Sequence, residues 1–236
     1  MSDARRAFPV FDEPSYKIPF QLTITAPTSQ KVYSNTPELK AIVNGDMTTH
    51  YFDKTPPIPS YLVAMAVGPF EELEIKGMPI PGRVITPQGK IHLAQYAKEN
   101  MPKVLGALEA YFGIPYVYKK LDSVAVPEFP FGAMENSGLV TYREDILLVD
   151  LAAATRSKKQ RNVSIIAHEL AHQWYGNLVT MKWWNDLWLN EAFASWMAAK
   201  ITKQLNPEFE SHLDLPQNNV MALDARLSTK PIRKPI

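Results

Sequence analysis

The chain has 236 residues, of which 46% are hydrophobic and 21% are charged. This composition excludes an intrinsically disordered chain and supplies enough apolar material for a sizeable core and two domains. The 25 basic and 24 acidic residues give a formal net charge of +1. Because so small a charge attracts neither nucleic acid nor an anionic membrane strongly, recognition must depend on local groups.

Cysteine is absent, which excludes disulfide bonds and thiolate zinc sites and leaves His, Asp and Glu as metal ligands. The N-terminal stretch lacks the continuous apolar run of a signal peptide, and no later stretch reaches the roughly 18 apolar residues of a membrane span. A basic stretch at 156–161 has no interleaved aromatic residues. We therefore expect a soluble, cytoplasmic chain with no membrane span and no nucleic-acid partner.

Prolines alternate with short apolar runs over residues 8–81. The runs FQLTIT, KAIVNG and YLVAMAVG are rich in β-branched residues or are bounded by Gly and Pro, which predicts strands joined by turns. The hydrophobic spacing then changes, and a helix that ends at Gly113 is predicted by the apolar series Ala97, Met101, Val104, Leu105, Leu108 and Phe112.

Two further strands are predicted at about 123–126 and 139–142, with the loop PEFPFGAMENSG between them. Helical spacing follows, in one helix with an apolar face from Val163 to Trp174 that ends at Gly176, and in another over 189–205 that stops before Pro207. Tryptophan recurs in this region, and we expect a packed core between the two helices to contain Trp174, Trp183, Trp184 and Trp188. The change of composition near residue 80 is the best candidate for a domain boundary.

The sequence HELAHQWYGN at 168–177 places two histidines four residues apart. On a helix such residues project from one face, so one metal ion can contact both His168 and His172. A catalytic zinc site needs a third protein ligand and keeps its fourth position for water. Glu191, separated from His172 by 18 residues within LWLNEAFAS, can return beside the pair on the next helix.

Glu169 follows the first histidine, as in the pattern H-E-x-x-H, where the carboxylate reaches the metal-bound water and acts as general base. Such a base is worth on the order of 100- to 10,000-fold in rate. The competing interpretation is that both histidines are ordinary core residues. The helical context and the position of Glu191 favour a zinc site, with one Zn²⁺ per chain.

Three segments together resemble the zinc aminopeptidases of the gluzincin group, the aminopeptidase N and puromycin-sensitive aminopeptidase family. They are ARRAFPVFDEP at 4–14, GAMEN at 132–136 and HELAHQWYGNLVTMKWWNDLWLNEAFA at 168–194. The resemblance implies an α+β fold, with the C-terminal part of a β-rich N-terminal domain at 1–80 and the first part of a thermolysin-like catalytic domain at 81–236. It implies the same zinc ligands and the same base, and peptide substrates with a free N-terminus.

The resemblance also makes GAMEN the substrate-binding loop, formed by Gly132, Ala133, Met134, Glu135 and Asn136. In this reading Glu135 binds the α-ammonium of the substrate, and backbone groups of Gly132 and Ala133 line the peptide path. A carboxylate opposite an ammonium group distinguishes a free N-terminus from an internal amide through a charge-assisted hydrogen bond.

Relatives carry a tyrosine well beyond the third zinc ligand that stabilises the oxyanion, and we expect that position to lie after residue 236. The loss of one oxyanion donor costs about 2.7 to 4 kcal/mol, so the chain alone is expected to be nearly inactive. Two alternatives stay open: a catalytically silent peptide- or zinc-binding module, and a bifunctional enzyme resembling leukotriene hydrolase. The second is disfavoured because the loop reads GAMEN rather than GGMEN.

Overall fold

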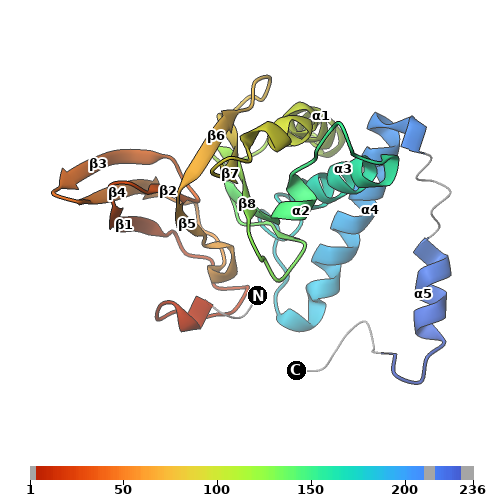
Figure 1. The fold of residues 1–236 in the computed structure, drawn as a ribbon. Helices are drawn as coiled ribbons and strands as arrows, with labels where there is room; N and C mark the ends of the chain where they lie inside the picture. The colour runs from red at the N-terminus through yellow and green to blue at the C-terminus, as the bar shows by residue number, and fades with distance from the viewer. Residues whose placement is uncertain (1–3, 210–215, 230–236) are drawn as a thin grey trace.

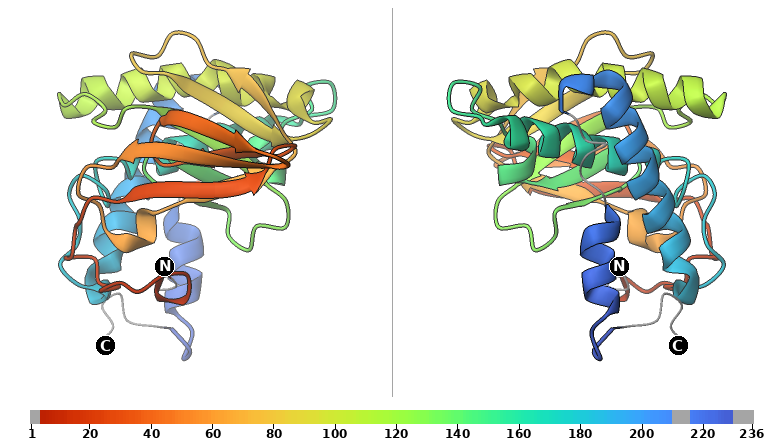
Figure 2. Two further views of the ribbon diagram at one scale, coloured as in Figure 1. Left: turned by 90° about the vertical axis from the view of Figure 1, so that its left-hand side faces the viewer. Right: turned by 90° about the vertical axis from the view of Figure 1, so that its right-hand side faces the viewer.

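A computed structural model describes residues 4–209 and 216–229 of the chain. Strands fill its first third and helices its last part (Figure 1). A five-stranded sheet stands in the middle, with the main helices on one side and a three-stranded sheet on the other. Figure 2 shows these two faces in turn. The α+β class expected from the sequence is confirmed.

The N-terminal strands form two small antiparallel sheets. The three-stranded sheet has the order β1-β4-β3, and β2 pairs with β5. Phe52 on β4 packs with Ala26 and Val32 in a small buried cluster, whereas every residue of β3 is exposed. These strands are β1 (Gln21–Pro27), β2 (Lys31–Ser34), β3 (Glu38–Asn44), β4 (Met47–Lys54) and β5 (Met65–Gly68).

The central sheet has the order β6-β7-β8-β10-β9. The strand pairs β7–β8 and β8–β10 are parallel, and the two edge strands run antiparallel to their neighbours. Its strands are β6 (Phe70–Glu74), β7 (Gly82–Pro87), β8 (Leu121–Val126), β9 (Ala133–Met134) and β10 (Leu139–Arg143). The predicted strands near 123 and 139 are therefore confirmed, and the GAMEN loop forms the crossing between them.

Residue 80, the predicted domain boundary, lies between β6 and β7. These two strands pair directly, with Glu74 opposite Arg83. The largest apolar core also takes residues from both sides of this point, including Leu62 and Val84. The boundary near residue 80 stays a prediction.

The helices are α1 (Gln95–Phe112), α2 (Glu144–Leu147), α3 (Arg156–Ala171), α4 (Leu187–Leu205) and α5 (Pro216–Asp224). Short 3₁₀ helices occur at Ala4–Arg6, Ser60–Leu62, Ile91–Ala94, Trp184–Asp186 and Pro207–Phe209. The predicted apolar face of α1 is buried except for Phe112, which is half-buried, and Gly113 ends this helix at a φ of 64°. A left-handed C-terminal residue of this kind favours glycine because glycine has no Cβ to clash.

Helix α3 begins at Arg156 and is capped by the preceding residue, Thr155, whose side chain accepts a hydrogen bond from the backbone N–H of Lys158. It ends at Ala171, before the predicted stop at Gly176. The next residues tighten into turns in which the N–H groups of Gln173 and Trp174 reach back only three residues. The expected tryptophan core is correct for Trp174, which is buried, but wrong for Trp188, which is 40% exposed.

Gly138 fixes the end of the GAMEN loop against the N-terminal strands. Its φ is +72°, and a Cβ added there would lie 2.1 Å from the carbonyl oxygen of Asn35. Gly89 has a similar φ of +84° but open space around it. A side chain at Gly89 would strain only the backbone conformation, whereas a side chain at Gly138 would also clash with Asn35. A comparison of the two positions therefore isolates the free-energy cost of the clash.

We expect Gly138→Ala to lower the free energy of unfolding by about 3 kcal/mol, because it adds a steric conflict to the left-handed conformation. Gly89→Ala, the control, should cost only about 1 kcal/mol. Urea-induced unfolding measures both values. Equal losses for the two variants would show that the contact with Asn35 is not restrictive.

Candidate functional site

The last turn of α3 brings two imidazole rings together. The ring centroids of His168 and His172 lie 4.6 Å apart, and their Nε2 atoms lie 3.0 Å apart. The four-residue spacing accounts for this geometry, because it places both side chains on one face of the helix. The predicted proximity of the two histidines therefore follows from the conformation of one short segment, the last turn of α3 and the residue after it.

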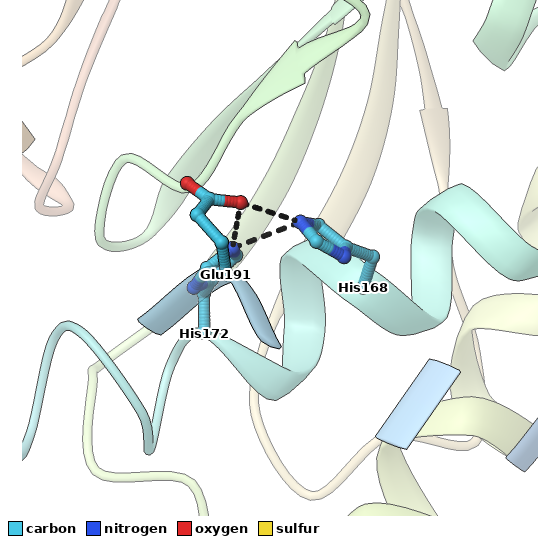
Figure 3. Close-up of side chains that lie close together, drawn as sticks. All are labelled: His168, His172 and Glu191. Carbon is cyan, nitrogen blue, oxygen red and sulfur yellow. Dashed lines mark hydrogen bonds and ion pairs between the residues drawn. The ribbon is translucent and has the colours of Figure 1, made fainter. Parts of the chain in front are cut away.

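Glu191 reaches the same point from α4. Its Oε2 atom lies 3.3 Å from Nε2 of His168 and 3.7 Å from Nε2 of His172 (Figure 3). Three donors that each lie about 2.1 Å from one zinc ion at tetrahedral angles are about 3.4 Å apart. The two nitrogens and the carboxylate oxygen have close to this spacing, so the three side chains fit a tetrahedral ion. Among the described residues this is the one cluster of this composition with such spacing.

The surroundings of His172 direct its Nε2 lone pair toward the cluster. Its Nδ1 atom lies 3.0 Å from the backbone carbonyl oxygen of Tyr175. Because a carbonyl can only accept, Nδ1 donates, and Nε2 is left as the ligand atom. On His168, Nδ1 lies 3.4 Å from Oγ of Ser195 on α4. Each ring therefore has a polar partner on the side away from the cluster.

The metal-free cluster holds a proton. Burial lowers the pKa of His172, but the hydrogen bond with Glu191 and the charges of Glu135, Glu169 and Glu191 outweigh burial and raise it to about 9. Burial raises the pKa of Glu191, but its hydrogen bonds with His168 and His172 outweigh burial and lower it strongly. A cation bound at this point replaces that proton.

Glu169 lines the same cavity as the cluster, and its pKa is shifted in the opposite direction from that of Glu191. Its side chain is buried, and this burial, together with the negative charges of Glu135 and Glu191, raises its pKa well above the ordinary value of 4.5. The carboxylate of Glu191 lies half-exposed beside it, with a lowered pKa. Two neighbouring carboxylates with pKa values shifted in opposite directions are typical of a site with divided acid–base roles.

The GAMEN loop forms the opposite wall. Glu135 is 3% exposed, and its Oε1 atom has no hydrogen-bond partner within the described ranges. A cavity of about 200 Å³ is lined by Phe131, Ala133, Met134, Glu135, His168, Glu169, His172 and Glu191. The structure therefore places the predicted metal ligands, the predicted base and three residues of the predicted loop around one cavity.

The other two loop residues lie outside the lining. The carbonyl oxygen of Gly132 accepts a hydrogen bond from the N–H of Arg143 on β10. Asn136 is buried, and its side-chain oxygen accepts a hydrogen bond from Thr141. Both contacts anchor the loop to the central sheet.

Sequence reasoning missed two buried amides behind the cavity, Gln173 and Asn177. Both donate hydrogen bonds to the backbone carbonyl oxygen of Glu135, at 3.1 Å and 2.8 Å. A signal was present, because Glu169, Gln173 and Asn177 recur at intervals of four residues in HELAHQWYGN. Phe131, which lines the cavity, carried no comparable signal.

Comparison with known proteins places this geometry in a family. The Peptidase M1 N-terminal domain model matches residues 1–62, and the Peptidase family M1 domain model matches residues 96–236. The chain belongs to peptidase family M1. The order of the two matches confirms the expected succession of a strand-rich N-terminal domain and the start of a catalytic domain.

Several relatives of this M1 chain are named aminopeptidases. Aminopeptidase M1-B of Oryza sativa is 44% identical over 236 residues, which is 98% of this chain and 27% of the relative. Aminopeptidase M1 of Arabidopsis thaliana is 44% identical over 210 residues, covering 89% of this chain and 24% of the relative. "Aminopeptidase 2, mitochondrial" of Saccharomyces cerevisiae is 42% identical over 238 residues, covering 100% of this chain and 25% of the relative. The M1 chain thus spans about a quarter of the length of these relatives.

No helix in the described ranges is long and apolar enough to cross a membrane.

The hydrogen-bonded cluster predicts how the stability of the metal-free M1 chain depends on pH. The pKa of His172 rises from 6.5 to about 9, so its stabilisation is complete below pH 6.5 and is lost as the pH rises through 9. The pKa of Glu191 is lowered from 4.5, so its contribution is present above pH 4.5 and is lost as the pH falls through the lowered value.

Glu191→Gln should therefore destabilise the metal-free chain most between pH 4.5 and 6.5. The destabilisation should shrink as the pH passes 9. Urea unfolding of both proteins in the presence of a chelator, at about pH 5.5 and about pH 9.5, measures the difference. A destabilisation that is equal at the two pH values contradicts the coupling between Glu191 and His172.

Proposed function

We propose that this chain carries the zinc site and the N-terminus-binding loop of an aminopeptidase that hydrolyses the first peptide bond of peptides with a free N-terminus. The observation that carries the proposal is that metal-type donors and the carboxyl group of Glu135 line one cavity. Three metal-type donors at tetrahedral spacing share this cavity with the buried carboxyl group of Glu135, whose Oε1 atom has no hydrogen-bond partner in the described ranges. Relatives named aminopeptidases support it.

One Zn²⁺ per chain would be held by His168, His172 and Glu191. Two neutral imidazoles and one carboxylate leave the ion with net positive charge, and a bound zinc ion supplies carbonyl polarisation and a bound water with a pKa near 7. The chain contributes the orientation of its ligands. The carbonyl of Tyr175 fixes the tautomer of His172, and Ser195 contacts the outer nitrogen of His168.

Glu169 would act as general base and then as general acid. Without a cation, burial raises the pKa of this carboxyl group, and a dication bound beside it would lower that pKa again, so that the ionised carboxylate could take a proton from water and pass it to the leaving amine. The nearby negative charges of Glu135 and Glu191 strengthen the affinity of the carboxyl group for a proton. The same residue can therefore take a proton from the attacking water and return it to the new N-terminus.

Glu135 would bind the α-ammonium of the substrate. The α-amino group has a pKa near 8, so it is mostly charged at neutral pH. Three carboxylates, of Glu135, Glu169 and Glu191, surround the cavity. A dication and an ammonium group together carry three positive charges, which balance the three carboxylates. Internal peptide bonds offer no such charge and would leave Glu135 buried without a partner.

The two alternatives differ from this proposal in measurable ways. A silent module would bind zinc or peptide without turnover. An enzyme resembling leukotriene hydrolase would also open an epoxide, for which the GAMEN loop offers no support. The cytoplasmic location expected from the sequence stays a prediction, since the name of the yeast relative assigns that protein to mitochondria.

The zinc site itself is tested on the chain. We expect one zinc ion per chain by elemental analysis after dialysis, and at least a tenfold weaker affinity after His172→Ala, which removes a ligand atom. His92→Ala, at an exposed histidine outside the cluster, is the control and should leave zinc affinity unchanged. Equal zinc affinity in both variants would exclude the proposed ligand set.

The base is tested by Glu169→Gln. We expect zinc content to be unchanged and turnover of leucine p-nitroanilide to fall by about 100- to 10,000-fold, because the amide cannot accept the proton. Turnover is measured on the chain and on a polypeptide of the relatives' length that carries this segment. Glu99→Gln, at an exposed residue of α1, is the control. Normal turnover by the Glu169 variant would disprove the assigned role, and chelator-insensitive turnover would disprove the zinc mechanism.

A further inference from the structure

We propose that Gln173 and Asn177 are positioning residues that clamp the backbone of Glu135 to helix α3 and so set the distance between the ammonium-binding carboxylate and the metal-binding histidines. The inference rests on the proposed function of Glu135. Neither residue lines the cavity, so both would act through the loop rather than by touching substrate.

Both amides converge on one acceptor. The carbonyl oxygen of Glu135 accepts hydrogen bonds from Nε2 of Gln173 at 3.1 Å and from Nδ2 of Asn177 at 2.8 Å. A carbonyl oxygen has two lone pairs, so these two donors saturate it. The peptide unit that follows Glu135 is thereby held from one side by two side chains from a different part of the fold.

Gln173 connects the loop directly to the helix that carries the proposed base. The same Nε2 atom that contacts Glu135 donates its second hydrogen to the backbone carbonyl of Glu169, also at 3.1 Å. One amide group therefore bridges the main chain of the two glutamates on opposite walls of the cavity. A shift of the loop relative to α3 has to break one of these two bonds.

Asn177 fixes the orientation of this bridge. Its Nδ2 atom lies 3.2 Å from Oε1 of Gln173 and 3.3 Å from Oγ of Ser137. The contact with Oε1 directs the amide of Gln173 so that its nitrogen faces both carbonyls. The backbone N–H of Asn177 also donates to the carbonyl of His172. The clamp thus begins at a proposed metal ligand and ends at the loop.

Burial makes these contacts restrictive. Gln173 and Asn177 are 2% and 1% exposed, so water cannot easily replace a lost donor. Truncation of either side chain leaves buried carbonyl groups with fewer partners, which favours movement of the loop toward other donors. Catalysis that needs Glu135 and Glu169 at a fixed separation is sensitive to shifts of about 1 Å between the loop and the helix.

The chain offers a matched control at Asn162 on α3. Asn162 is also 1% exposed, and its Nδ2 atom donates to two backbone carbonyls, of Ile146 and Leu147, at 2.9 Å and 3.0 Å. Asn162→Ala therefore removes a comparable pair of buried hydrogen bonds without touching the GAMEN loop. General destabilisation should affect both asparagine variants, whereas an effect on Glu135 should appear only in Asn177→Ala.

The test compares leucinamide, which has a free α-ammonium, with N-acetyl-leucinamide, which has none. Binding of each to the zinc-loaded chain is measured by NMR titration at neutral pH. We expect the unmodified chain to prefer leucinamide, and the preference to fall by about tenfold in Asn177→Ala and in Gln173→Leu. Zinc affinity should stay unchanged in both, and Asn162→Ala should keep the full preference. An undiminished preference in the folded Asn177 or Gln173 variant overturns the proposal.

A second measurement separates this inference from the proposed function. Amide hydrogen exchange is followed over residues 132–138, and we expect it to accelerate at least tenfold in Asn177→Ala but not in Asn162→Ala. If the unmodified chain shows no preference for leucinamide, the role of Glu135 in binding an ammonium is wrong, and the exchange data alone decide the clamp. Equal exchange rates in the two variants would show that Asn177 does not hold the loop.

Discussion

The packing of α4 against the last turns of α3 is the contact on which the site depends. The histidine pair belongs to α3 alone, but the third donor comes from another helix, and a metal tolerates errors of only a few tenths of an ångström. Ala167 and Ala171 on α3 and Ala194 and Ala198 on α4 are buried in the same apolar core. Small side chains allow two helix axes to approach closely, which brings the carboxylate of Glu191 within reach of both imidazoles.

This dependence explains which features the sequence could predict. Local periodicity was sufficient for α1, for the histidine pair and for Glu169, because one helix determines their relative positions. Glu191 was predictable because 18 residues allow one helix to end and another to return. The four-residue spacing marked Gln173 and Asn177 but did not identify their partner, since Glu135 lies 38 residues before Gln173 and the contact depends on how a sheet crossing packs on a helix end. The early end of α3 was missed for a related reason, because the turns at 172–176 contact distant parts of the chain: Tyr61 donates to the carbonyl of Gly176, and Trp174 donates to the carbonyl of Ile114.

Two buried charge clusters in the chain show how differently charge can be arranged. Near β7 and β8, Asp122 is held by both Arg83 and Lys120, and Lys120 also donates to the carbonyl of Gly138. Arg83 also donates to Glu72, so each charge in that cluster has a partner of opposite charge at hydrogen-bond distance, as buried charges in a structural role require. The cavity cluster is not balanced, because three carboxylates surround two imidazoles. Burial, together with the charges of Glu135 and Glu191, raises the pKa of Glu169. The hydrogen bond with Glu191 and the surrounding charges raise the pKa of His172 against the effect of burial. A cation bound at this point would offset the excess negative charge.

The loop that carries Glu135 also joins the two parts of the chain that the family models match separately. Asn35, within the N-terminal match, donates through Nδ2 to the carbonyls of Ser137 and Leu62, both at 2.8 Å. Asn177, within the catalytic match, holds Glu135 two residues earlier. The loop is therefore held over residues 135–137 by side chains from both matched parts of the chain. The N-terminal part of the chain thus helps to hold this loop, because Asn35 donates to the backbone carbonyl of Ser137 while Asn177 contacts the hydroxyl of the same residue.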